Sequence, residues 1–132
     1  MQTLGKEEKL KKRKVIEALF KNGKAISANP VRLIWAEAED KSGKFPLQTG
    51  FSVSKRTFKR AVDRNKVKRL MREGFRKNKS EIYAFMEENN LKYSIIFIYT
   101  QKKIIPFKDI EQKIISALNR FQETLIKLKE VK

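Results

Sequence analysis

The stretch from Lys55 to Arg72 reads K-R-T-F-K-R-A-V-D-R-N-K-V-K-R-L-M-R, and it organises the rest of the chain. Between Ser54 and Lys79 there are twelve Lys or Arg residues and two acidic residues, a net charge of +10 in 26 residues. The whole chain of 132 residues carries +17, so more than half of its excess charge lies in one fifth of its length. This concentration of charge predicts a surface that attracts a polyanion.

The same stretch has the periodicity of an amphipathic helix. Apolar or small residues recur at i, i+3, i+4, i+7 and i+8, which predicts one buried face made of Val67, Leu70, Met71, Gly74 and Phe75. Basic residues recur at every fourth position and stack along a different face, namely Arg60, Arg64, Lys68, Arg72 and Arg76. Solvated basic faces are common, but these charges have few acidic partners at i+4, and arginine suits phosphate oxygens. We therefore favour contact with nucleic acid.

Composition narrows the class of protein. A hydrophobic fraction of 40% with nine Phe indicates one folded domain rather than a charged disordered chain. No apolar run reaches the roughly 18 residues of a membrane span, and the N-terminus lacks the apolar segment of a secretory signal. The absence of Cys and His excludes disulfides, thiol chemistry and the Ser-His-Asp machinery. These features predict a cytoplasmic protein without a membrane partner, whose acidic clusters, including Glu7–Glu8, are solvated rather than catalytic.

The patterns along the chain predict a single domain over residues 1–132, with α/β layers around one mixed sheet. The expected elements are a helix over 9–22, a weakly indicated strand over 24–28, strands over 31–39 and 47–54, the basic helix over 58–78, a short helix over 80–90, a doubly buried strand over 92–100 and a last helix from Pro106. Gly23 is expected to end the first helix in a left-handed conformation. Residues 1–8 are expected to form a loose basic arm, and residues 129–132 to fray.

The segment 47–54 has two different faces. Leu47, Thr49, Phe51 and Val53 alternate with small or polar residues, so Phe51 and Val53, together with Ile96 and Ile98, are expected in the interior of the sheet. The small or polar residues on the other face are Gln48, Gly50, Ser52 and Ser54. With Arg32 and Ile34 of the preceding strand, that face can form the floor of a groove or a plain solvated surface. The residues alone leave both possibilities open.

Phe20 is the other residue with two interpretations. It lies in the last turn of the first helix, beside an apolar stripe of Val15, Ile16 and Leu19. An aromatic residue on such a stripe is more often part of the core, which is the interpretation that the helix alone favours. The alternative is an exposed platform on which an unpaired base stacks.

Two motifs resemble the protein subunit of bacterial ribonuclease P. They are G-F-S-V-S-K-R at Gly50–Arg56 and R-A-V-D-R-N-K-V-K-R-L-M-R-E at Arg60–Glu73. The core of the family's basic helix is R-N-x-x-K-R-x-x-R, which is matched here by Arg64, Asn65, Lys68, Arg69 and Arg72. Lys66 stands where the family more often has arginine. The helix end F-K-N-G at Phe20–Gly23 and the order of elements also fit, so that the resemblance spans roughly residues 9–128.

The resemblance implies a fold and a role. The fold is α+β in two layers, with a helix, three strands, the basic helix, a strand and a helix around one four-stranded mixed sheet. It includes a left-handed strand–helix–strand crossover, as in the ribosomal protein S5 domain 2-like fold, although the general rule favours the right-handed one. The role is to bind the catalytic RNA and the 5′ leader of precursor tRNA, as a monomer in a 1:1 complex without DNA. The RNA would carry out the magnesium-dependent hydrolysis, so that no residue of this chain is catalytic and no side chains alone hold a cofactor.

The resemblance also assigns residues to two surfaces. The catalytic RNA would be bound by the basic helix through Arg60, Arg64, Asn65, Lys66, Lys68, Arg69 and Arg72. The leader would lie in a cleft between the first helix and the sheet, lined by Phe20, Arg32, Ile34, Ser52, Ser54, Lys55 and Arg56. Where relatives often have a second aromatic residue, one turn before Phe20, this chain has Ile16, for which burial is expected. No function is assigned to residues 80–90.

Two other classes of protein compete with this one. A stand-alone RNA-binding or ribosomal protein would explain the charge and the fold, but not the basic-helix motif together with the Gly/Ser strand before it. A protein-only nuclease would need a cluster of carboxylates that hold metal ions, and the sequence offers no evident one.

Overall fold

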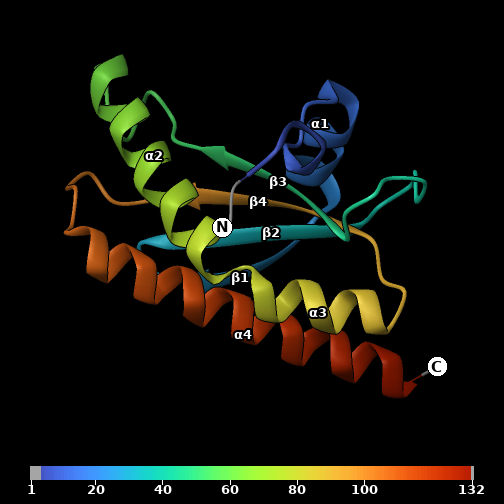
Figure 1. Ribbon diagram of the computed structural model, residues 1–132. Coiled ribbons are helices and arrows are strands. Elements are labelled where there is room, and N and C mark those ends of the chain that lie inside the picture. Colours follow the sequence, from blue (N-terminus) through green and yellow to red (C-terminus); the bar gives the residue numbers. More distant parts are fainter. Residues whose placement is uncertain (1–3, 132) are drawn as a thin grey trace.

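The computed structural model describes residues 4–131, and its elements follow the predicted order (Figure 1). These are η1 (Lys6–Glu8), α1 (Arg13–Asn22), β1 (Lys24–Ala28), β2 (Val31–Glu37), β3 (Leu47–Ser52), α2 (Ala61–Asn78), α3 (Ser80–Glu88), β4 (Tyr93–Tyr99) and α4 (Phe107–Val131). The weakly indicated first strand is present as β1. Because α4 continues to Val131, residues 129–131 are helical and the fraying expected there is wrong; residue 132 lies outside the described range.

The four strands form one mixed sheet in the order β1-β2-β4-β3. The pairs β1–β2 and β2–β4 are antiparallel, whereas β3 and β4 are parallel. A parallel pair needs a crossover connection, and α2 and α3 supply it here. The basic helix is therefore the element that joins the two parallel strands.

The main core lies between the sheet and the layer formed by α2, α3 and α4. The sheet contributes alternate residues, among them Leu33, Trp35 and Phe97, and α2 contributes Val67, Met71 and Phe75. Val53 is buried in this core, and Phe51 packs against it while half-buried. The predicted register of β3 is therefore confirmed.

A second, smaller core lies on the opposite face of the sheet, under α1. It consists of Leu10, Leu19, Ile34 and Ile96, with Ile16 and Ile98 packed against it. Both faces of β4 are thus covered, as its unbroken apolar sequence predicts. The α+β fold is confirmed, and α1 adds a short third layer to the two that were expected.

The N-terminal segment is not the loose arm that was expected for residues 1–8, although residues 1–3 lie outside the described part. Leu10 N–H donates to the carbonyl of Thr49 at 3.0 Å, which attaches the segment to the edge of β3. The Glu8 carboxylate is only 3% exposed and accepts bonds from Lys79 Nζ at 2.5 Å and from the Tyr83 hydroxyl at 2.6 Å. Its partners are more than 70 residues away, so that local sequence gives no sign that this acid is buried.

Gly23 ends α1 for a reason different from the expected one. Its φ and ψ are −67° and 150°, an extended conformation open to any residue, so the predicted left-handed conformation is wrong. A Cβ atom at this position would lie 2.4 Å from Ile34 Cγ2 and 2.5 Å from the Leu19 carbonyl oxygen. The glycine is therefore required by the close approach of the chain to β2 and to the last turn of α1.

Replacing Gly23 with alanine is expected to destabilise the fold by about 1–3 kcal/mol, because the new methyl group overpacks this junction. The change in unfolding free energy can be measured by urea denaturation. Gly43→Ala is the matched control, since no atom lies within 4 Å of a Cβ there. Equal midpoints for the two variants would contradict the packing argument.

Candidate nucleic-acid interface

The exposed surface of α2 has two flanks with different charge. The buried seam of α2, which contains Val67, Met71 and Phe75, separates these flanks. Each residue can be assigned to one flank because successive residues of a helix are about 100° apart. On the flank toward β3 the charged side chains are all basic, and we call Asn65, Lys68, Arg69 and Arg72 the basic strip. The flank toward α4 carries both acids of the helix, Asp63 and Glu73, together with Lys66. Of the predicted RNA-binding residues, Lys66 therefore lies apart from the strip.

The remaining predicted residues of this set lie at the start of α2. The Arg64 side chain folds back over the preceding turn, where Nη1 donates to the carbonyls of Phe58 and Lys59, both at 2.8 Å. Arg60 pairs with Asp63 at 3.8 Å. Arg64 thus has a structural task in closing the turn before the helix, which the sequence pattern did not indicate.

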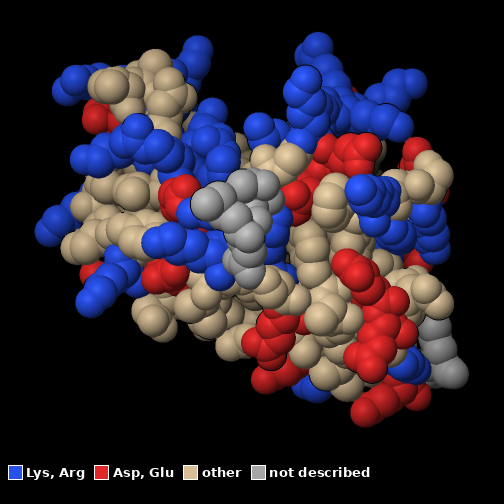
Figure 2. Space-filling model, in the orientation of Figure 1, with Lys and Arg blue, Asp and Glu red and all other residues tan. Residues whose placement is uncertain are grey.

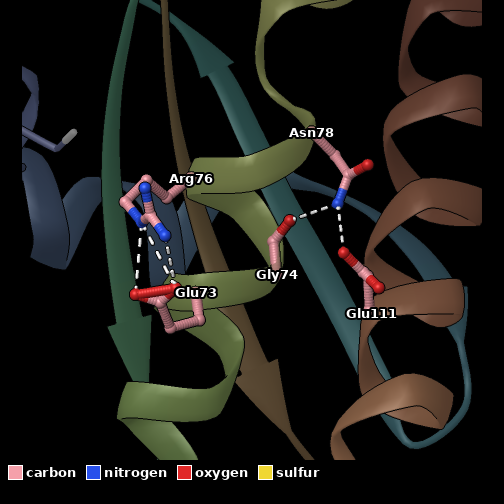
Figure 3. Close-up of polar contacts among 5 residues, drawn as sticks. All are labelled: Glu73, Gly74, Arg76, Asn78 and Glu111. Carbon is pink, nitrogen blue, oxygen red and sulfur yellow. Dashed lines mark hydrogen bonds and ion pairs between the residues drawn. The ribbon is translucent and has the colours of Figure 1, made fainter. Parts of the chain in front are cut away.

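The end of α2 is held by polar contacts that are shown in Figure 3. Arg76 Nη2 lies 2.7 Å from Glu73 Oε2, and this hydrogen bond lowers the pKa of the Glu73 carboxyl. The Asn78 amide donates to the Gly74 carbonyl at 2.7 Å and to Glu111 Oε2 of α4 at 3.0 Å. Arg76 is accordingly engaged within the protein and does not belong to the basic strip.

A row of four residues crosses the sheet on the face that carries α1. The strand registers pair Ser27 with Arg32, Arg32 with Ile98, and Ile98 with Ser52. Directly opposite residues share a face, so these side chains lie side by side across all four strands. We call Ser27, Arg32, Ile98 and Ser52 the polar row. Ser27 and Ile98 were not among the predicted cleft residues.

Ile34, predicted to line the cleft, lies in the next row, under α1. It is only 7% exposed because it packs with Leu19 and Ile96 in the second core. It therefore supports the floor but presents almost no surface to a ligand. The sequence could not reveal this, because the position of α1 over that row is a tertiary contact.

Phe20 is exposed, contrary to the core interpretation that the helix pattern favoured. Half of its surface (50%) is accessible. Leu19 faces the sheet, and Ala18 and Phe20 lie about 100° to either side of it. Ala18, with Val15, lines a pocket on one flank of α1. Phe20 therefore lies on the opposite flank, toward the polar row. Ile16 lies on the same flank, half-buried against the second core, as expected.

The turn after β3 holds the last three predicted cleft residues. Lys55 and Arg56 are exposed, and both follow directly from the strand that ends the polar row. The Ser54 side chain is engaged with Thr57, with 2.9 Å between the two hydroxyl oxygens and 3.2 Å from Thr57 N to Ser54 Oγ. This serine therefore shapes the turn that presents the two basic side chains.

Charge is distributed unevenly over the surface (Figure 2). Lys and Arg gather over α2 and over α1, and the outline dips between these two groups, in the region where β3 ends in Figure 1. Asp and Glu gather at the opposite end, over α3 and the end of α4. The depression thus lies between α2, which carries the basic strip, and α1, which carries Phe20, and we call it the cleft.

A pocket of about 720 Å³ opens on the other flank of α1, and sequence analysis did not indicate it. Its lining combines Lys12, Arg13 and Lys14 with acidic residues after β2, including Asp40. Lys12 Nζ lies 3.7 Å from Asp40 Oδ2, and hydrogen bonds from Ser42 lower the pKa of that carboxyl. The charges of the pocket therefore largely compensate one another, which distinguishes it from the cleft.

Residues 4–131 contain no group of three His, Cys, Asp or Glu side chains close enough to hold a metal ion. In the same range, no helix is both long and apolar enough to cross a membrane.

A basic α+β domain with a charged helix beside an open sheet face has the features typical of RNA-binding proteins. The family model for ribonuclease P matches residues 4–122. The ribonuclease P protein component of Porphyromonas gingivalis is 32% identical over 117 residues, covering 89% of this chain and 85% of the relative. That of Chlorobium phaeobacteroides is 31% identical over 121 residues, covering 85% and 83%. The chain belongs to the ribonuclease P family.

Solved structures agree with this assignment. The ribonuclease P protein of Staphylococcus aureus superposes with a TM-score of 0.66 at 26% identity, covering 85% of this chain and 93% of that one. The protein from Thermotoga maritima gives a TM-score of 0.67 at 24% identity, covering 86% and 96%, and this similarity bears on the fold alone.

Proposed function

We propose that this chain, as the protein component of ribonuclease P, uses the two walls of the cleft for two RNAs. The basic strip would bind the ribonuclease P RNA, and the polar row with Phe20 would hold the single-stranded 5′ leader of precursor tRNA. The observation that carries the proposal is the cleft between α2 and α1, on both sides of which Lys and Arg gather (Figure 2). Removal of the leader would then take place with both RNAs held by one small protein.

The chemistry of each wall supports its assignment. Lys68, Arg69 and Arg72 supply positive charge, and the neighbouring Glu73 is paired with Arg76, so the strip suits the closely spaced phosphates of a folded RNA. The row offers hydroxyls, one guanidinium and an apolar side chain, and Phe20 adds an aromatic face. A single strand is typically bound by such a combination of stacking and backbone contacts.

The catalytic centre belongs, on this proposal, to the RNA, with magnesium ions that the RNA and its phosphates hold. The lack of His and Cys in the sequence is consistent with this division of labour. The proposal further includes a cytoplasmic location and a 1:1 complex of monomeric protein with RNA, without DNA or membrane.

Reconstitution tests the function directly. Adding the protein to its cognate ribonuclease P RNA at low magnesium is expected to accelerate cleavage of precursor tRNA at the 5′ end, while the protein alone cleaves nothing. Cleavage by the protein alone, abolished by one Asp or Glu substitution, would contradict an RNA-borne centre. Co-purification with ribosomal subunits instead of one long structured RNA would favour a ribosomal protein.

Phe20→Ala is expected to weaken binding of precursor tRNA to the holoenzyme by about 5- to 150-fold, because stacking of one base contributes about 1–3 kcal/mol. Mature tRNA, which has no leader, is expected to bind as before. The affinities for both tRNAs and the melting temperature are the measurements.

Ile126→Ala is the matched control for Phe20→Ala, since Ile126 is an exposed apolar side chain on α4. It should alter neither affinity. An equal loss of affinity for precursor and mature tRNA in Phe20→Ala would remove the leader-stacking role from this residue.

A further inference from the structure

Phe51 connects the aromatic core to the basic strip. Its ring lies parallel to that of Phe97, with 5.7 Å between centroids and 13° between planes, and meets the edge of Phe75 at 6.2 Å. The Cζ atom of Arg72 lies over the same ring, 5.8 Å from its centroid, which is within the range of a cation–π interaction. The guanidinium of the strip therefore lies over a ring that the core holds in place.

The arginines on and around α2 are held in different ways. Arg64 and Arg76 donate their N–H groups to backbone carbonyls and to a carboxylate of the protein itself, and Arg60 forms a longer ion pair with Asp63 at 3.8 Å. Arg72 makes no hydrogen bond or ion pair within residues 4–131 and is held by its contact with Phe51 instead. A guanidinium that rests on an aromatic ring keeps its N–H donors at its edge, where an oxyanion can still accept from them.

The Phe51–Arg72 pair lies at the edge of the sheet. Phe51 directly precedes Ser52, the β3 member of the polar row, and the two side chains point to opposite faces of the sheet. Arg72 therefore lies at the edge strand β3, on the face of the sheet opposite to the polar row. An arginine side chain has many rotamers in solution, and contact with a fixed ring reduces them before RNA arrives.

We propose that Phe51 is a positioning residue for RNA binding. It holds the Arg72 guanidinium at the edge of β3 with its N–H donors free to receive a phosphate group of the bound RNA. The inference rests on the proposed function, because it takes the basic strip as the surface that binds RNA. It adds a specific claim, namely that a side chain from the core sets the orientation of one charge on that surface.

A double-mutant cycle tests this claim in the full-length protein, with ribonuclease P RNA as the probe. Phe51→Leu removes the ring but keeps an apolar side chain and all charges, and Arg72→Gln removes the guanidinium. We expect Phe51→Leu to weaken RNA binding by about 2- to 5-fold, as befits a partly exposed cation–π contact. In the Arg72→Gln background, the same substitution should have no further effect.

The salt dependence of RNA affinity distinguishes the charge of Arg72 from its orientation. Arg72→Gln is expected to lower the slope of log affinity against log salt by about 0.7–0.9, which corresponds to one phosphate contact. Phe51→Leu should leave the slope unchanged, because the charge is still present. Phe51→Tyr keeps the aromatic ring and is expected to bind RNA with the affinity of the unmodified protein. The melting temperature of Phe51→Leu shows whether that variant is folded, so a folding defect can be told apart from the loss of the ring.

Three results would overturn the inference. The first is an equal loss of affinity on Phe51→Leu with and without Arg72, which would assign the effect to the strand rather than to the guanidinium. The second is a failure of Phe51→Tyr to restore affinity in a protein with normal melting temperature. The third is unchanged affinity and slope in Arg72→Gln. Failure of the proposed function would be visible separately, as absent binding of ribonuclease P RNA by the unmodified protein.

Discussion

Replacing Lys68, Arg69 and Arg72 by glutamine is expected to lower the affinity for ribonuclease P RNA by about 100- to 500-fold at 0.1 M salt. Each phosphate contact contributes about 0.7–0.9 to the slope of log affinity against log salt, so that three contacts contribute about 2–2.7 log units at this salt concentration. The slope itself should fall by the same 2–2.7. Titrations of labelled RNA at several salt concentrations measure both quantities.

The matched control is the triple replacement of Lys108, Lys113 and Lys127 by glutamine. These three lysines are exposed on α4, away from the cleft, and their loss changes the net charge by the same amount, from +17 to +14. If the control variant loses as much affinity as the strip variant, general attraction between a basic protein and RNA would explain the binding, and the basic strip would have no special role. Arg64 is left intact in both variants because it closes the turn before α2.

Glu8→Ala is expected to destabilise the protein by about 3–5 kcal/mol, since it leaves the buried Lys79 ammonium without its carboxylate partner. For a domain of this size the melting temperature should fall by about 10–20 °C. Glu7→Ala is the control, because the neighbouring side chain is exposed and carries the same charge. Thermal unfolding followed by circular dichroism measures both variants.

A second variant tests whether the loss of stability in Glu8→Ala comes from the buried charge. Replacing the pair with apolar residues and removing the Tyr83 hydroxyl, as in Glu8→Leu, Lys79→Met, Tyr83→Phe, should recover much of the lost stability, because no charge or hydroxyl then remains buried without a partner. If this triple variant is as unstable as Glu8→Ala, the loss would come from packing of the N-terminal segment and not from the loss of the Glu8–Lys79 ion pair.

The same cluster predicts a pH dependence. Burial by itself raises the pKa of the Glu8 carboxyl, but hydrogen bonds from the Gly5 N–H, Lys79 and Tyr83 outweigh it and leave the pKa below its ordinary value of 4.5. Because the folded-state pKa is depressed, this stabilisation is fully present above about pH 4.5 and is lost as the pH falls through the folded-state pKa. Glu8→Ala should therefore flatten the acid side of the stability profile, which Glu7→Ala should leave as it is.

Several features could be predicted from sequence because they depend on local patterns. The order of the elements, the buried seam of α2 around Met71 and the alternation of β3 all follow from the spacing of apolar residues. The family motif at Arg60–Glu73 led to the correct family, and the family to the fold. Such features require only that a residue be compared with its neighbours in the chain.

The failures share a different cause. The Glu8 carboxylate looked solvated because its partners, Lys79 and Tyr83, follow more than 70 residues later. Phe20 looked like part of the core because the helix pattern shows which residues are apolar, but not how wide a stripe the sheet will cover. Gly23 looked like a left-handed helix end, whereas the side chain of Ile34 on β2 is what leaves no room for a Cβ atom.

The sequence alone determined that a strongly basic, amphipathic helix would join two strands of an α+β domain, because hydrophobic periodicity and charge are properties of consecutive residues. Only the tertiary structure decided which basic side chains remain available on that helix. Arg64 and Arg76 are engaged by carbonyls and a carboxylate, whereas Arg72 rests on Phe51 with its donors exposed. The reason is physical: a charge is free or bound according to the groups that packing brings within about 3 Å, and packing joins residues that the sequence keeps far apart.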